Sequence, residues 1–235
     1  STPLYSSAAS DVYKRQEKIF ANSWICVGHR SEVADNNAYI TRDVIGESII
    51  VVRGRDGVLR AFYNVCPHRG HQLLQGDGKA KNVITCPYHA WTFKLDGDLA
   101  HARNCDNVVD FDKANSSLVG LRVEEYAGFI FINMNADAGS VESQLPGLQA
   151  RLRQACPVVD DLHLAARFVT ETPANWKSIV DNYMECYHCA PAHPGFADSV
   201  DVGQYTHTMH GNWSLQFGVA KSSPCLLYTS DAADE

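Results

Sequence analysis

The chain has 235 residues, 45% of them hydrophobic, which is enough to bury a core in one large domain or one and a half ordinary ones. Its formal net charge is −7, and its 20 Lys and Arg residues are scattered, so a basic surface for nucleic acid or anionic lipid is excluded. The longest apolar runs, 49–52 and 129–132, are far too short to span a membrane, and no signal-peptide pattern is present. We expect a cytoplasmic protein.

The two ends look foreign to the rest of the chain. Residues 6–16 read SSAASDVYKRQ, and residues 225–235 read CLLYTSDAADE. With suitable codons for the first segment, its reverse complement encodes the second in a shifted frame. This relation is typical of one DNA adapter read from both strands, so residues 1–16 and 225–235 are interpreted as adapter-derived. We expect residues 17–224 to be an internal piece of a longer protein.

Residues 24–133 have the pattern of a β domain. Short runs rich in Val, Ile, Tyr and Phe alternate with turn signals such as Asp56-Gly57 and Asp96-Gly97. The runs expected to form strands are 24–27, 39–42, 48–52, 59–64, 83–85, 91–95, 118–124 and 129–133. Short strands in this number predict a small antiparallel sandwich or barrel.

Two Cys–His pairs follow strands of this region and therefore lie on loops. CPHRG supplies Cys66 and His68, and CPYHAW supplies Cys86 and His89. Two thiolates and two imidazoles are the ligand set of a Rieske [2Fe-2S] cluster, in which two His replace two Cys on one iron. Neutral imidazoles raise the reduction potential by at least roughly 0.25 V relative to all-cysteine plant-type clusters, which suits a relay fed by a flavin or ferredoxin.

A structural zinc site is the alternative for these four residues, because two Cys and two His are also adequate zinc ligands. Cys-x-His is, however, a tight first pair for a zinc finger, in which Cys-x-x-Cys is the usual opening. The spacing and the loop context favour the cluster. Trp91, two residues after His89, is expected to shield it from water.

After residue 133 the pattern becomes mixed. A helix is expected over 141–155 despite Pro146 and Gly147, a strand over 168–172, and a helix over 178–189, which contains no Gly or Pro. The expected fold class is therefore α+β. An all-β [2Fe-2S] domain with an N-terminal flank occupies 17–160, and an incomplete second domain begins in 161–224.

The run DNYMECYHCAPAH at 181–193 contains a second candidate metal site. His188 and His193, with a carboxylate, would form the facial triad of non-haem Fe(II) oxygenases, which leaves positions open for O₂ and substrate. Their spacing rotates the second His by about 140° on an ideal helix, so the helix must bulge or end between them, as Pro191 allows.

Glu185 lies one helical turn before His188, on the same face of the predicted helix. Its carboxylate can accept the ring N–H that His188 does not use for iron, which fixes the tautomer of the imidazole. Taken alone, the pair His188 and His193 would also fit ordinary core or surface histidines. The upstream cluster motif favours iron.

The remaining candidates have ordinary explanations. His207 and His210 lie in a polar, strand-like run and are interpreted as surface or core histidines. The cysteines without a partner at metal spacing are expected to be small buried hydrophobic residues; they are Cys26, Cys105, Cys156, Cys186 and Cys189.

The pair of motifs CPHRG and CPYHAW resembles the Rieske domain of the Rieske non-haem iron oxygenases. Asn175-Trp176-Lys177 followed by DNYMECYHC is similar to the start of the catalytic domain of their α subunits, and the resemblance covers nearly all of 17–224. Respiratory Rieske proteins carry an extra Cys in each ligand loop, where this chain has His71 and Tyr88. The resemblance implies a helix-grip-like catalytic domain in which His188 and His193 bind iron.

The resemblance also implies partners and a route for electrons. A separate NAD(P)H-dependent reductase or ferredoxin would supply the electrons, and the full-length protein would be a homotrimer or an α3β3 assembly. Glu185 would connect the iron to His89 of the partner subunit. O₂ and a small organic substrate would react at the iron, in a mono- or dioxygenation.

Three functions remain open. Glu185 stands where most family members have Asp, and ECYHC resembles the branch that oxidises quaternary ammonium compounds such as carnitine, choline and betaines. The alternative is an aromatic ring-hydroxylating dioxygenase α subunit, which would serve aromatic compound catabolism. A Rieske ferredoxin that only carries electrons is the third, although it would have no use for His188 and His193.

One element of the family pattern is absent. In relatives the third iron ligand is a carboxylate far downstream, and the nearest acids here, Asp198 and Asp201, are interpreted as loop or surface residues. We expect the third ligand to lie beyond residue 224 of the longer protein. The chain by itself is therefore expected to bind iron poorly and to be inactive.

Overall fold

The computed structural model describes residues 14–105 and 107–221. The chain divides into two compact units, Ser1–Ala166 and Arg167–Glu235, and each is described by itself. The ends interpreted as adapter-derived lie outside the described residues, apart from residues 14–16. Among the described helices, none is both long and apolar enough to cross a membrane.

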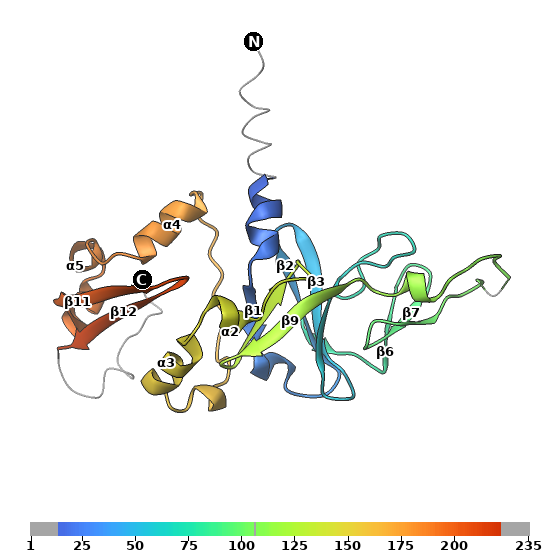
Figure 1. Ribbon diagram of the computed structural model, residues 1–235, viewed down its shortest axis with the longest axis horizontal. Coiled ribbons are helices and arrows are strands. Elements are labelled where there is room, and N and C mark those ends of the chain that lie inside the picture. Colours follow the sequence, from blue (N-terminus) through green and yellow to red (C-terminus); the bar gives the residue numbers. More distant parts are fainter. Residues whose placement is uncertain (1–13, 106, 222–235) are drawn as a thin grey trace, which may run out of the picture. The chain divides into compact units, whose positions relative to one another are not determined.

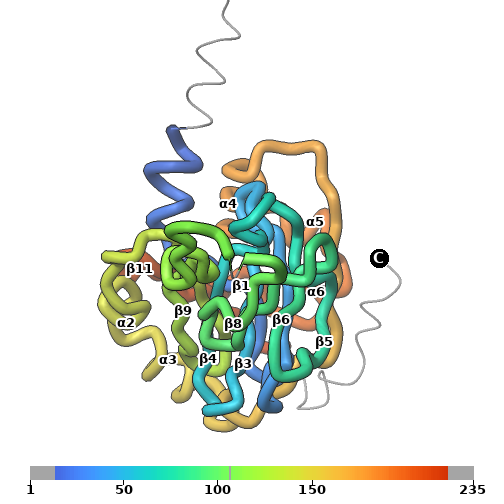
Figure 2. Tube along the Cα trace, turned by 90° about the vertical axis from the view of Figure 1, so that its right-hand side faces the viewer, coloured from blue at the N-terminus to red at the C-terminus, as the bar shows by residue number. Residues whose placement is uncertain are grey.

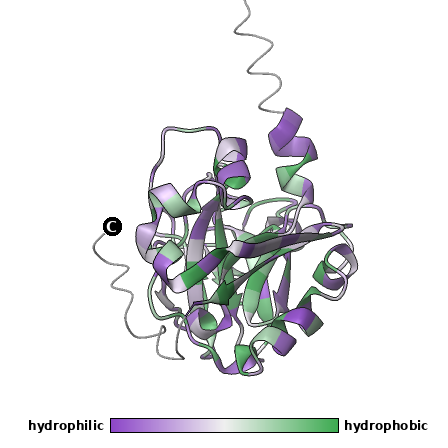
Figure 3. Ribbon diagram, turned by 90° about the vertical axis from the view of Figure 1, so that its left-hand side faces the viewer, coloured by the Kyte–Doolittle hydropathy of each residue, from purple (hydrophilic) through white to green (hydrophobic). Residues whose placement is uncertain are grey.

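The first unit is built on a seven-stranded antiparallel sheet with the order β1-β10-β9-β4-β3-β2-β5 (Figure 1). Its strands are β1 (Ile25–His29), β2 (Ala38–Val44), β3 (Glu47–Arg53), β4 (Leu59–Tyr63), β5 (Gly78–Lys79), β9 (Gly120–Tyr126) and β10 (Phe129–Asn133). Figure 3 shows hydrophobic residues gathered along the strands. The predicted antiparallel β domain is confirmed.

A three-stranded sheet, β6-β7-β8, packs beside β3 and β4 of the large sheet (Figure 2). Its strands are β6 (Val83–Thr85), β7 (Thr92–Lys94) and β8 (Leu99–His101). The eight strands expected within residues 24–133 are all present, with ends that differ by at most two residues, whereas β5 and β8 were not expected. These two are only two and three residues long, too short to produce a periodic pattern.

Strand β3 is covered on both faces. Ile50 and Val52 belong to a hydrophobic cluster shared with β6 and β7, whereas Ile49 and Val51 belong to a second cluster shared with β2 and β10. All four side chains are 0% exposed. Because successive side chains in a strand point to opposite faces, a continuous apolar run is what a strand between two cores requires.

The two predicted turn signals are confirmed. Asp56-Gly57 lies between β3 and β4, where Gly57 has φ 76° and Asp56 Oδ1 accepts the Val58 N–H at 3.1 Å. Asp96-Gly97 lies between β7 and β8, and Gly97 has φ 97°. A Cβ on Gly97 would lie 2.5 Å from Cε1 of Phe62, so this glycine is required by its conformation and by packing.

The helix expected over 141–155 is two helices. Helix α2 (Val141–Gln144) and helix α3 (Leu148–Ala155) are separated at Pro146-Gly147, where Gly147 has φ 78°. Proline lacks the N–H that helix continuation needs, and the left-handed glycine redirects the chain. Short 3-10 helices complete the unit: η1 (Phe20–Asn22), η2 (Arg30–Val33), η3 (Ala114–Ser116) and η4 (Val159–Asp161).

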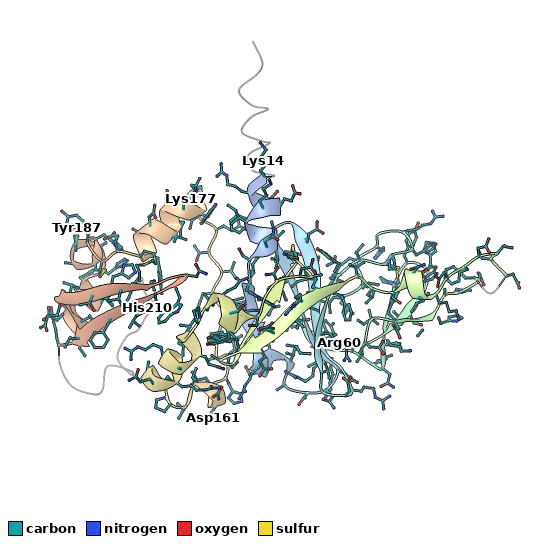
Figure 4. The ribbon with its side chains drawn as sticks, in the orientation of Figure 1. Lys14, Arg60, Asp161, Lys177, Tyr187 and His210 are labelled. Carbon is teal, nitrogen blue, oxygen red and sulfur yellow. A yellow bond between two sulfur atoms is a disulfide. The ribbon has the colours of Figure 1, made fainter. Side chains whose placement is uncertain are left out.

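The second unit consists of three short helices and a hairpin (Figure 1). These elements are α4 (Trp176–Tyr183), α5 (Cys189–Ala192), α6 (Pro194–Ser199), β11 (Val200–His210) and β12 (Trp213–Ala220). His207 and His210, interpreted as surface or core histidines in a strand-like run, lie at exposed positions on β11, and Figure 4 labels His210 there. The α+β fold class is confirmed.

Two predictions for this unit are wrong. Residues 168–172 form no strand, since no strand of the described chain pairs with them, and Phe168 and Val169 are 91% and 82% exposed. The helix expected over 178–189 ends at Tyr183. There Glu185 Oε2 accepts the N–H of Tyr187, a local side-chain bond that competes with the helical pattern.

Candidate metal centres

The two Cys–His loops of the first unit are closed in the same way. The Cys66 N–H donates to the His71 carbonyl at 2.8 Å, and the Gly70 N–H donates back to the Cys66 carbonyl at 2.9 Å. In the second loop, the Cys86 N–H donates to the Trp91 carbonyl at 2.8 Å, and the Ala90 N–H donates to the Cys86 carbonyl at 3.0 Å. These paired bonds fix each cysteine at the start of a tight loop, and the predicted loop position of both Cys–His pairs is confirmed.

The sulfur donors lie inside and the imidazoles outside. Cys66 and Cys86 are 1% and 2% exposed. Burial, with a contribution from Cys86, raises the pKa of the Cys66 thiol. The rings of His68 and His89 lie with centroids 4.7 Å apart. The predicted ligands therefore meet in two pairs, Cys66 with Cys86 and His68 with His89, and each pair takes one residue from each loop.

One atom of this group is direct evidence for a metal site. His89 Nδ1 is buried and has no hydrogen-bond partner within the described residues. Buried polar atoms are nearly always paired, so an orphaned ring nitrogen beside two thiols and a second imidazole fits an iron ligand. Desolvation first, and then the positive charge of His68, lower the pKa of His89. A lowered pKa favours the neutral imidazole that a metal requires.

Aromatic rings surround the two imidazoles. Trp91 is 5% exposed and stacks on His68 with centroids 4.6 Å apart and an interplanar angle of 5°, in agreement with its predicted shielding position. Tyr88 is 56% exposed, and its ring centroid lies 3.8 Å from that of His89. An open cavity of about 570 Å³ lies on this side, lined by His68, residues 87–91 and residues 103–105.

The second unit brings the other predicted site together in one stretch of chain. His188 immediately precedes α5, and His193 connects α5 to α6. Their ring centroids are 5.3 Å apart. Glu185 Oε1 lies 2.5 Å from His188 Nδ1, so the predicted contact is present although it is made in a turn and not along a helix. This bond leaves Nε2 of His188 for a metal.

The charge state of Glu185 follows from this contact. The hydrogen bond from His188 is the main cause that lowers the pKa of the Glu185 carboxyl, and the Tyr187 N–H adds to it. Figure 4 labels Tyr187, which is 96% exposed. The carboxylate is thus ionised at neutral pH and accepts from both groups.

A cavity of about 470 Å³ adjoins this pair of histidines. Tyr183, Phe196 and Tyr205 line it together with His188 and His193. The Tyr205 hydroxyl donates to Gln216 Oε1, and Gln216 Nε2 donates to the Tyr183 carbonyl at 3.0 Å, which ties the hairpin to the end of α4. Sequence reasoning did not identify these aromatic residues, because they come from three separate elements.

Among the described residues, no group of three or more His, Cys, Asp or Glu side chains surrounds a single metal position. A Rieske cluster takes two protein ligands per iron, and the second site has two His within the described chain. The Asp201 carboxylate accepts hydrogen bonds from the Gly203 N–H at 3.0 Å and from Gln204 Nε2 at 2.6 Å. Asp198 is exposed on α6, as expected of a surface acid, whereas Asp201 lies in β11 and is partly buried, so its interpretation as a loop or surface residue is wrong.

The expectation that the remaining cysteines are buried and without partners is wrong in two respects. Cys186 and Cys189 form a disulfide, with Cα atoms 5.0 Å apart. Their Cys-x-x-Cys spacing was the sequence signal for this disulfide. It overlaps the predicted iron-ligand motif, because His188 lies between the two cysteines. Cys26 is exposed, because it lies on β1 at an edge of the large sheet, whereas Cys105 and Cys156 are partly buried.

Two family models match the chain in succession. The Rieske [2Fe-2S] domain matches residues 23–113, and the ring hydroxylating alpha subunit (catalytic domain) matches residues 159–224. The first match contains all four predicted ligands of the cluster loops. The second contains Glu185, His188 and His193.

Curated relatives and solved structures agree with these matches. The chain is 72% identical over 208 residues to the carnitine monooxygenase oxygenase subunit of Escherichia coli K12, covering 88% of this chain and 56% of that protein. It is 36% identical over 199 residues to the glycine betaine monooxygenase oxygenase subunit of Chromohalobacter salexigens, covering 84% and 44%. The crystal structure of a quaternary ammonium Rieske monooxygenase with L-carnitine has TM-score 0.84 at 72% identity, covering 88% and 58%.

A more distant structure, naphthalene 1,2-dioxygenase with indole, has TM-score 0.73 at 27% identity, covering 82% of this chain and 45% of that one. The chain thus spans about half the length of the curated relatives it matches. The predicted alternative of aromatic compound catabolism is not supported, because the relatives at 72% identity are carnitine monooxygenase subunits.

Proposed function

Since the chain belongs to the α subunits of the Rieske non-haem iron oxygenases, we propose that it is part of an oxygenase component that oxidises a quaternary ammonium compound. The observation that carries this proposal is the 72% identity to carnitine monooxygenase subunits, together with the ligand geometry of both metal sites. Residues 17–160 would be the Rieske domain and 161–224 the start of the catalytic domain. Residues 1–16 and 225–235 would be adapter-derived.

The first unit would hold a [2Fe-2S] cluster. Cys66 and Cys86 supply buried sulfur to one iron, and His68 and His89 supply ring nitrogens to the other. When bound, the cluster supplies one-electron transfer, and the mononuclear iron supplies O₂ activation. Trp91 covers His68 and excludes water from that side.

The second unit would hold the mononuclear Fe(II). His188 and His193 supply two nitrogens, and we assign the third ligand to a carboxylate of the longer polypeptide. Glu185 holds the proton of His188 Nδ1 and so orients the ring with Nε2 toward the metal position. Each carboxylate oxygen can accept two hydrogen bonds, so Glu185 retains capacity for a further donor.

We assign that further donor to His89 of the partner subunit. With Nδ1 directed to iron, the Nε2–H of such an imidazole remains free to donate to a carboxylate. This connection between subunits requires an oligomer, and a homotrimer or an α3β3 assembly would provide it. Electrons would come from NAD(P)H through a separate reductase or ferredoxin.

The substrate class is supported by the cavity beside the histidines. Tyr183, Phe196 and Tyr205 line it, and aromatic faces bind quaternary ammonium groups through cation–π attraction. Glycine betaine and choline monooxygenases among the relatives act on compounds that carry such a group.

The test uses a polypeptide extended to the full length of the relatives, supplied with a reductase and NAD(P)H. We expect O₂ consumption coupled to the loss of L-carnitine or glycine betaine, and none with naphthalene. The matched control is His188→Ala, which should retain the cluster and lose turnover. Consumption with naphthalene alone, yielding an arene diol, would overturn the substrate class and favour the ring-hydroxylating alternative.

A further inference from the structure

A disulfide encloses the turn that carries an iron ligand. Cys186 and Cys189 flank His188, and the Cys189 N–H donates to the Cys186 carbonyl at 3.2 Å. Cys189 is the first residue of α5 and is 7% exposed, which makes it the one buried residue among the described residues of its unit. The proposed oxygenase mechanism uses neither sulfur.

The two sulfurs differ in their surroundings. Cys189 lines the cavity of about 470 Å³ together with His188 and His193, whereas Cys186 does not line it. A small oxidant that enters or arises in that cavity therefore meets Cys189 first. Cys186 precedes His188 in the chain, whereas Cys189 follows it. The Cα atoms of Cys186 and Cys189 are 5.0 Å apart, within reach of a sulfur–sulfur bond.

We propose that Cys189 is an oxidative modification site, that Cys186 is its resolving thiol, and that the oxidant is hydrogen peroxide. The Cys189 sulfur attacks one peroxide oxygen, the O–O bond breaks, an S–O bond forms, and water leaves, so Cys189 becomes a sulfenic acid. The Cys186 sulfur then attacks the Cys189 sulfur, the S–O bond breaks, and a second water leaves. Two thiols are oxidised to one disulfide, and one peroxide is reduced to two waters.

The resolving step determines whether the damage is reversible. A sulfenic acid with a nearby thiol condenses to a disulfide, which reductants restore, whereas one without a partner proceeds to the irreversible sulfinic acid. Cys186 therefore protects the residue beside His188 in a cavity where O₂ chemistry is proposed. Intracellular disulfides are usually transient or redox-sensing, which suits this role.

The sequence provides a clean readout. Digestion after Lys177 and Lys221 releases residues 178–221, which contain Cys186 and Cys189 and no other cysteine. The purified protein is reduced, exposed to a series of hydrogen peroxide concentrations, alkylated and mapped by mass spectrometry. We expect this peptide to lose both alkylatable thiols and about 2 Da, and to recover both thiols after treatment with a reductant.

Single variants assign the two roles. In Cys186→Ser, Cys189 should proceed to sulfinic acid, with a gain of about 32 Da that reductants do not reverse. In Cys189→Ser, Cys186 should stay alkylatable at the same peroxide concentration. Cys156→Ser is the matched control, because Cys156 is a partly buried free cysteine of the other unit, and it should leave peptide 178–221 unchanged from wild type.

Three results would overturn the proposal: both thiols intact at a peroxide concentration that converts Met184 of the same peptide to its sulfoxide, sulfinic acid at Cys189 in the wild-type protein, or equal oxidation of the two single variants. The experiment needs neither cluster nor iron. A negative result here would leave the proposed oxygenase function standing, and a negative turnover assay would leave this site standing.

Discussion

The two proposed metal sites of this chain are built in opposite ways. The cluster ligands come from two loops held by two sheets, and the hydrophobic cluster beneath them includes Ile50, Phe93 and both ligand cysteines. The histidine pair comes from one short stretch, residues 188–193, in a unit where Cys189 alone of the described residues is buried. The first site is therefore preorganised by tertiary packing, whereas the second depends on local turns and on the groups that bind there.

The sharpest test of this contrast removes one cluster ligand. Cys86→Ser should abolish the [2Fe-2S] content almost completely, because the loop cannot offer another thiolate at that position. Iron and acid-labile sulfide analysis measures the loss, and circular dichroism checks that the sheets persist. Cys156→Ser is the control with full cluster content. An EPR spectrum of the wild-type protein typical of an all-cysteine cluster would contradict the assigned His ligands.

At the second site the corresponding test changes Glu185, which orients the ligand His188. Glu185→Gln removes the negative charge that holds the His188 Nδ1 proton, so we expect turnover of the full-length protein to fall by about 10–100-fold or more with both metals retained. Metal analysis and substrate-dependent O₂ uptake measure the two effects. Glu185→Asp serves as the conservative comparison. Unchanged turnover in Glu185→Gln would rule out the proposed connection between subunits.

Side-chain packing should contribute more to stability around the first site than around the second. Phe93 is 0% exposed between the sheets, so Phe93→Ala should lower the free energy of unfolding of its unit by about 3–5 kcal/mol. Phe196, in the histidine unit, is 40% exposed, and Phe196→Ala should cost about 1 kcal/mol or less. Chemical denaturation measures the free energy of unfolding of both variants. Similar losses of this free energy would show that the second unit is packed as tightly as the first.

Tyr126 ties the helices after β10 to the large sheet. Its hydroxyl donates to Glu142 Oε2 at 2.6 Å and accepts the Gln149 N–H at 2.9 Å, so Tyr126→Phe should cost about 1–3 kcal/mol at neutral pH. Burial, followed by the bond to Glu142, raises the pKa of Tyr126 from 10.0 to about 12. Its stabilising contribution is thus complete below pH 10 and is lost as the pH rises toward 12. Alkaline denaturation should be steeper in wild type than in Tyr126→Phe.

The smallest effects lie within the cluster loops. Gly70 and Ala90 occupy equivalent positions, with φ 68° and 58°, and a left-handed conformation costs a residue with a Cβ about 1–2 kcal/mol relative to glycine. Ala90→Gly should therefore stabilise the protein by about 1 kcal/mol, and Gly70→Ala should destabilise it by a similar amount. Thermal unfolding of the two variants should shift in opposite directions. A shift in the same direction would mean that the loops are not equivalent.

The sequence predicts the first unit well because its information is local and periodic. Runs of Val, Ile, Tyr and Phe between turn signals located the strands, and the two Cys–His motifs, which follow strands, were placed on loops. The second unit was predicted less well because its structure depends on single side-chain bonds. The Tyr187 N–H donates to the Glu185 carboxylate where a helix ends although its composition favours continuation. The spacing of hydrophobic residues along the chain gives no indication of such a bond. The Cys-x-x-Cys spacing of Cys186 and Cys189 was a signal for their disulfide, but spacing alone does not show that the two sulfurs meet.

Strand β3 has a consequence for folding cooperativity. Its alternate residues, Ile49 and Val51 on one face and Ile50 and Val52 on the other, belong to both hydrophobic clusters of the first unit. Loss of β3 would remove packing from both clusters, so we expect the two cores to unfold as one event and the amide hydrogens of β3 to exchange only through global opening. Binding energy released at the cysteine loops would therefore protect backbone amides on the far side of the sheet as well.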